Sequence, residues 1–139
     1  MLKLLTVLVP LVALLDGWIH RPGFPDFTLA LLIPLLLCGE GPWILPLAFV
    51  AAVFREALDP SPPWVFPLFI VLVYTAVQVL RVRVNLRLFS LRLVLAILVV
   101  FSNLLVLHVT HRYPLDSPDL WLTGVSTVIV SLVFLVGMK

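Results

Sequence analysis

Charged residues are scarce in this sequence. Asp, Glu, Lys and Arg make up 12% of its 139 residues, whereas apolar residues make up 63%. An ordinary soluble domain is about 25% charged and about 45–50% apolar. A chain of this size with so little charge cannot build a water-facing surface. The composition therefore excludes a soluble globular domain and a disordered chain, and it predicts a polytopic integral membrane protein.

The sequence also lacks the residues that many functions require. Cys38 is the only cysteine, so an internal disulfide and the cysteine spacings of zinc, haem and iron–sulfur sites are excluded. No nucleophile elbow, Walker A pattern or H-E-x-x-H motif occurs. The net charge of +2 is too small for a nucleic-acid-binding surface. These absences predict no enzyme, no cofactor and no nucleic-acid partner.

Six apolar segments remain when the chain is divided at its polar and Pro/Gly clusters, which are the strongest local breaks. A membrane-spanning helix needs roughly 20 apolar residues, so the sequence predicts an all-α membrane bundle of about six transmembrane helices in a single domain, 1–139. The second segment is short and contains Pro34, so a re-entrant hairpin formed with the third segment is an alternative. The segments cover about 4–19, 24–37, 43–58, 64–80, 88–109 and 120–138.

Basic residues collect on one side of this bundle. Alternate connections place six of the nine Lys and Arg residues there, and cytoplasmic loops carry such an excess. Both termini and the loop 81–92 are therefore predicted to be cytoplasmic. The arginines of that loop have two interpretations: they set the topology and contact anionic lipid, or they form a docking surface for a cytoplasmic partner. The six residues are Lys3, Arg81, Arg83, Arg87, Arg92 and Lys139.

Polar residues at the outer ends of the segments form a candidate groove. Ionisable side chains at membrane depth are costly and usually face the bundle interior or water. Arg55 and Asp59 are four residues apart, so they would share a helix face. The alternatives are an interfacial ion pair that ends the helix, and a weak metal site at the histidines. The candidate residues are Arg55, Glu56, Asp59, Asp16, His20, His108 and His111.

Small residues are expected to let the helices approach one another closely. On the third segment these are Ala48, Ala51 and Ala52, and on the sixth they are Gly124 and Ser131.

The order of these features resembles the MreD family of rod shape-determining membrane proteins. A proline–acid start at 25–32 precedes a short helix, and the segment 48–58 ends in an acid and a short loop. In that family the third helix has small residues leading to an aspartate and then a glycine-containing loop. Here Ala48 and Ala52 take the small positions and Glu56 takes the acid position, while prolines replace glycine in the loop 59–63.

The resemblance implies a scaffold in the bacterial cytoplasmic (inner) membrane. MreD-like proteins bind the single transmembrane helix of MreC, and they belong to the cell-elongation complex with MreB filaments, the glycosyltransferase RodA and a class B transpeptidase. The expected function is therefore regulation of cell shape and peptidoglycan synthesis. The family also resembles the substrate-binding subunits of energy-coupling-factor transporters. A vitamin-binding subunit of such a transporter is the alternative function.

Overall fold

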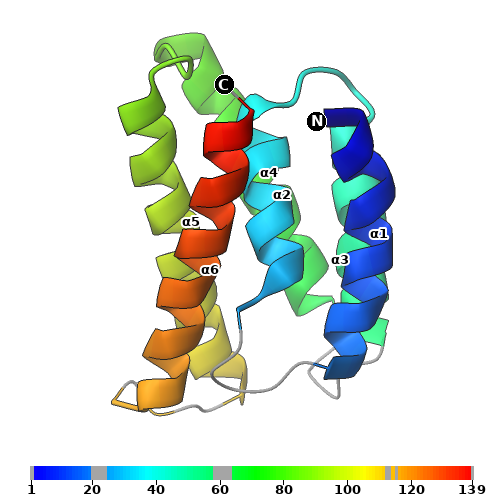
Figure 1. The fold of residues 1–139 in the computed structure, drawn as a ribbon, viewed down its shortest axis with the longest axis vertical. Helices are drawn as coiled ribbons and strands as arrows, with labels where there is room; N and C mark the ends of the chain where they lie inside the picture. The colour runs from blue at the N-terminus through cyan, green and yellow to red at the C-terminus, as the bar shows by residue number, and fades with distance from the viewer. Residues whose placement is uncertain (1, 20–24, 58–63, 112–113, 115, 139) are drawn as a thin grey trace.

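The structure, a computed structural model, describes residues 2–19, 25–57, 64–111, 114 and 116–138. All regular secondary structure within these ranges is helical, and successive helices run in opposite directions along a bundle (Figure 1). This confirms the predicted helical bundle. The helices are α1 (Leu2–Ile19), α2 (Phe27–Cys38), α3 (Ile44–Ala57), α4 (Val65–Arg83), α5 (Phe89–His111) and α6 (Pro118–Gly137).

Among the described residues, three helices are long and apolar enough to cross a membrane. They are α4, α5 and α6, with spans of 19, 22 and 20 residues, and they make this a membrane protein. By contrast, α2 and α3 have 12 and 14 residues. At 1.5 Å per residue they are about 18 and 21 Å long, shorter than a hydrocarbon core of about 30 Å. Six complete crossings therefore stay a prediction, as does the hairpin alternative.

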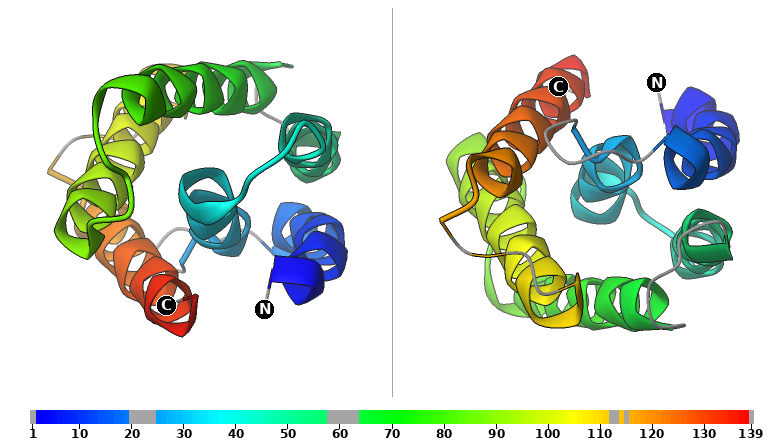
Figure 2. Two further views of the ribbon diagram at one scale, coloured as in Figure 1. Left: turned by 90° about the horizontal axis from the view of Figure 1, so that it is seen from above. Right: turned by 90° about the horizontal axis from the view of Figure 1, so that it is seen from below.

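The short helix α2 occupies the centre of the bundle. Seen along the bundle, the other five helices form an arc around it (Figure 2), and α2 packs against every one of them. All ten residues from Thr28 to Leu37 are buried. A helix that is apolar on every side must be covered on every side, and the run LALLIPLLL within α2 satisfies that condition.

Small residues permit close packing of the surrounding helices. Ala48, Ala51 and Ala52 are fully buried on α3, which packs on α1, α2 and α4. A Cβ atom added at Gly124 of α6 would lie 2.6 Å from the Leu104 Cδ1 atom of α5. The missing side chain therefore lets α5 and α6 approach, as predicted.

Some helix boundaries differ from the predicted segments. The side chain of Asp26 accepts a hydrogen bond from the Leu29 N–H, so it is the N-cap and α2 begins at Phe27. At the other end, α4 continues to Arg83, beyond the predicted end at residue 80. The predicted basic loop is therefore mostly helical: Arg81 and Arg83 lie in the last turn of α4, Arg92 lies in α5, and Arg87 lies in the connection.

Candidate functional site

Three ionisable side chains meet inside the bundle near the start of α2. They are Asp16 of α1, Asp26 before α2 and Arg55 of α3, and each is at most 7% exposed. Arg55 Nη2 donates to Asp26 Oδ2 at 2.6 Å, and Arg55 Nε lies 3.9 Å from Asp16 Oδ2. Burying a charge is costly unless it is paired and hydrogen-bonded, and here the guanidinium is paired with both carboxylates.

Backbone and hydroxyl groups donate further hydrogen bonds to the carboxylates of this cluster. Asp16 Oδ2 accepts from the N–H and the hydroxyl of Thr28 at 3.1 and 2.8 Å, and Asp26 Oδ1 accepts from the Leu29 N–H at 3.0 Å. The Asp26 N–H donates to Thr127 Oγ1 of α6 at 2.9 Å. We call Asp16, Asp26, Thr28, Arg55 and Thr127 the buried polar network.

The network is electrostatically suited to the end of α2 at which it lies. The N-terminus of a helix carries a partial positive charge, and both carboxylates gather there. The Arg55 guanidinium also lies over the Phe66 ring of α4, with Cζ 3.8 Å from the ring centroid, in a cation–π contact. The network and Phe66 therefore connect α1, α2, α3, α4 and α6 at one point.

These contacts revise the predicted outer groove. Arg55 and Asp16 belong to the candidate set, but the structure places them in a closed interior cluster, where they do not line an open groove. The partners of Arg55 come from α1 and the start of α2. The predicted partner Asp59 lies outside the described residues, as do His20 and the side chain of His111. His108 is half-buried on α5, which packs against α2 and α6.

Asp26 is a residue of the network that the predicted groove omitted. The signal for it was local: an acid directly after a proline and directly before a long apolar run is typical of a helix N-cap. Its ion pair with Arg55, 29 residues away, had no comparable signal.

Glu56 has a structural role at the start of α4. Its carboxylate accepts from the N–H groups of Trp64 at 2.8 Å and Phe66 at 3.1 Å. The first N–H groups of a helix have no partner within the helix, and a carboxylate also favours this positive end. Glu56 therefore holds the chain where α4 begins, and Trp64 adopts a left-handed backbone conformation there (φ 72°).

Metal binding gains no support from the described part of the chain. No group of three or more His, Cys, Asp or Glu side chains in those ranges could hold a metal ion.

The opposite end of α2 is held by a cation. Arg81 Nη2 donates to the carbonyl oxygens of Leu36, Leu37 and Gly39 at 3.0, 3.2 and 2.5 Å. The last carbonyls of a helix lack intrahelical partners and carry a partial negative charge. Arg81 therefore caps α2 from α4.

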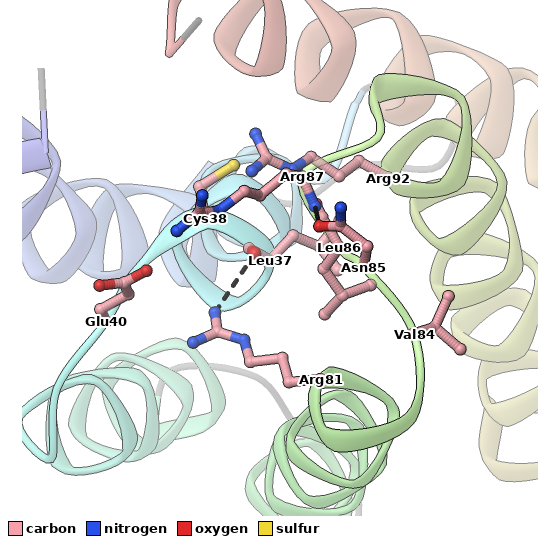
Figure 3. Close-up of a pocket in the computed structure, with 9 residues that line it drawn as sticks. All are labelled: Leu37, Cys38, Glu40, Arg81, Val84, Asn85, Leu86, Arg87 and Arg92. Carbon is pink, nitrogen blue, oxygen red and sulfur yellow. Dashed lines mark hydrogen bonds between the residues drawn. The ribbon is translucent and has the colours of Figure 1, made fainter.

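A cavity of about 250 Å³ lies beside this capped end, between α2 and the connection from α4 to α5. Figure 3 shows Arg81 reaching the end of α2 from one side, while Arg87 and Arg92 lie near Cys38 on the other. Arg92 Nε donates to the Leu86 carbonyl at 2.6 Å. The cavity walls thus carry three arginines and one acid, Glu40.

Fold and site together define a helical membrane protein built around a buried helix whose two ends are held by charged side chains. Comparison with protein-family models, curated proteins and solved structures gives no match to this chain.

Proposed function

We propose that this protein is an integral membrane scaffold subunit of a bacterial cell-elongation (rod) complex. It binds the transmembrane helix of an MreC-like protein and helps regulate cell shape and peptidoglycan synthesis, in company with MreB filaments, RodA and a class B transpeptidase. The observation that carries this proposal is the pairing of Asp16, Asp26 and Arg55 with one another inside the bundle. A small-molecule carrier would offer such groups to its ligand.

Outward-facing side chains support a role in helix–helix or helix–lipid contact. Leu72 of α4, Leu105 of α5 and Val133 of α6 are 69%, 57% and 65% exposed. Similar apolar residues recur along the outer sides of these three helices. A transmembrane helix of a partner can pack on such a surface by van der Waals contact.

The arrangement of the helix ends supports an inner-membrane topology with both termini in the cytoplasm. The start of α1, the end of α6 and the connection from α4 to α5 lie at the same end of the bundle (Figure 1). Arg81, Arg83 and Arg87 are at that end, where the basic excess of cytoplasmic segments is expected. A reporter fused after Lys139 that is active only outside the cytoplasm would refute this orientation.

The scaffold proposal is tested by capture of an MreC-like partner. We expect the tagged protein to co-purify with a co-expressed MreC-like single-span protein in mild detergent. The control is an unrelated single-span protein expressed at the same level. Equal recovery of both proteins, or of neither, would contradict the proposal.

Cysteine crosslinking identifies the face that binds the partner. Cys38→Ser removes the only cysteine, after which Leu72→Cys, Leu105→Cys and Val133→Cys each place one thiol on an exposed face. We expect one helix face to crosslink to a cysteine series in the partner's transmembrane helix, with a helical period. Uniform weak crosslinking from all three faces would indicate random collision.

The alternative, a vitamin-binding subunit of an energy-coupling-factor transporter, has its own signature. Native mass spectrometry of the purified protein would show a small organic ligand bound in stoichiometric amount. Such a ligand, together with failure to capture the MreC-like partner, would replace the scaffold proposal.

A further inference from the structure

The cavity at the end of α2 carries more positive charge than the described residues around it neutralise. Arg81, Arg87 and Arg92 line it, and Glu40 is the only acid among the lining residues that the structure describes. None of the three arginines forms an ion pair with another described residue. Two uncompensated positive charges therefore remain at this cavity.

Several guanidinium donors around the cavity are unused within the described chain. Arg81 bonds to the α2 carbonyls through Nη2 alone, and Arg92 bonds to Leu86 through Nε. Arg87 is an exposed residue, and its guanidinium has no hydrogen bond to a described residue. Arginine presents five N–H donors in a planar fork, and a fork with free N–H groups matches the geometry of phosphate oxygens.

The dimensions and surroundings of the cavity favour a small anionic group. Its volume of about 250 Å³ is below the roughly 300–1,000 Å³ of pockets for drug-sized molecules. It lies where α4 ends and α5 begins, and the neighbouring apolar side chains of Val82, Val84 and Leu88 are exposed. Exposed apolar residues beside a basic cavity at the end of membrane helices fit the boundary between acyl chains and headgroups.

We propose that this cavity is a phosphate-binding site, in which Arg87 and Arg92 contact the phosphate oxygens and Arg81 contributes from the α2 cap. The shared chemistry is a phosphate group, either of an anionic phospholipid or of a soluble phosphate. This site is separate from the scaffold function proposed above and does not depend on it.

The test compares two arginines of the cavity with one outside it. Arg87→Gln and Arg92→Gln remove charges that line the cavity. Arg83→Gln instead removes an exposed charge at the end of α4, and this residue is not among those that line the cavity. All three substitutions change the net charge equally. Arg81 is left intact because its replacement would disturb α2 itself.

One arm of the experiment measures retained lipid, and the other measures soluble phosphate. Protein in nanodiscs of phosphatidylcholine mixed with phosphatidylglycerol is transferred to detergent, and bound lipid is identified by native mass spectrometry. Protein in pure phosphatidylcholine nanodiscs is titrated with inorganic phosphate, and its melting temperature is followed against sodium chloride at equal ionic strength.

We expect selective retention of phosphatidylglycerol. Its occupancy falls about tenfold or more in Arg87→Gln or Arg92→Gln, as for loss of a hydrogen bond to a charged group, and at most about fivefold in Arg83→Gln, as for a charge merely near an anionic surface. A melting shift with phosphate alone, lost in Arg87→Gln and kept in Arg83→Gln, would support the site with a soluble ligand. Equal losses in all three variants, or no selectivity in either arm, would overturn the proposal.

Discussion

The two ends of α2 are held by opposite charges, but only one end is closed. At its start, Asp16 and Asp26 gather at the positive helix terminus and are paired with Arg55. At its end, Arg81 donates to three carbonyl oxygens at the negative terminus. Both arrangements complement the helix dipole. The first is buried among five helices, whereas the second lies beside a cavity of about 250 Å³.

This difference assigns a structural role to the start of α2 and a binding role to its end. In the buried polar network the carboxylates of Asp16 and Asp26 accept hydrogen bonds from Thr28, Leu29 and Arg55, so few groups remain for a ligand. At the other end, Arg87 and Arg92 line the cavity and keep guanidinium N–H groups that have no partner among the described residues. The start of α2 is therefore expected to control stability, and its end is expected to control interactions.

Removing the cation from the closed end is expected to have the largest effect. Arg55→Met leaves two buried carboxylates without their partner, and breaking a buried ion pair in this way costs about 3–5 kcal/mol. The free energy of unfolding is measured by denaturant titration or steric trapping in bicelles. Arg83→Gln, at an exposed residue, is the control and should change the free energy of unfolding by less than about 0.5 kcal/mol. Equal stability of the two variants would show that the buried polar network does not stabilise the start of α2.

A second substitution sharpens the same test. Asp26→Asn in the Arg55→Met background removes one of the uncompensated charges, while asparagine still caps a helix well. We therefore expect the double variant to be more stable than Arg55→Met alone, because only the Asp16 carboxylate then remains buried without a cationic partner. A double variant less stable than Arg55→Met would mean that the carboxylate of Asp26 is stabilised by groups other than Arg55.

At the open end, Arg81→Ala is expected to cost about 2 kcal/mol, the value for hydrogen bonds to a charged group. The loss is smaller than for Arg55→Met because the freed carbonyls adjoin a cavity that water can enter. The same unfolding measurement checks it, with Arg83→Ala as the control on the same turn of α4. A cost as large as that of Arg55→Met would contradict the distinction between a closed and an open end.

Glu56 provides an intermediate case, since it caps α4 near the closed end. Glu56→Ala removes the acceptor of the Trp64 and Phe66 N–H groups and is expected to cost about 1 kcal/mol, as for loss of an N-cap. Glu56→Gln should cost less, because the amide oxygen can still accept. Hydrogen exchange should show faster exchange of these two amides in Glu56→Ala, and unchanged protection there would contradict the capping role.

Much of the fold follows from features that the sequence displays locally. Long apolar segments predict α5 and α6 closely, because hydropathy and flanking prolines mark where a helix leaves the membrane. The predicted end of α4 was too early, because a hydropathy boundary stops at the first arginine. In the structure Arg81 is still helical, and its guanidinium donates to carbonyl groups at the end of α2.

The site was less predictable because it depends on tertiary contacts. Sequence spacing favoured Asp59 as the partner of Arg55, since four residues make one helix turn. Packing of α1 on α3 instead brings Asp16 close to Arg55. The central position of α2 has a signal in its uniform apolarity from Leu29 to Leu37, whereas its short length suggested only the re-entrant hairpin alternative.

The smallest expected effects come from two hydroxyls one turn apart on α6, and they test whether pairing within the network matters. Thr127 Oγ1 accepts from the Asp26 N–H, so Thr127→Val leaves a buried donor unsatisfied and should cost about 1 kcal/mol. Ser131 is equally buried, but its Oγ has no hydrogen-bond partner among the described residues, so Ser131→Ala should change the unfolding free energy by less than about 0.5 kcal/mol. Equal costs for the two would mean that burial alone, and not the contact with α2, determines the contribution of a hydroxyl in this bundle.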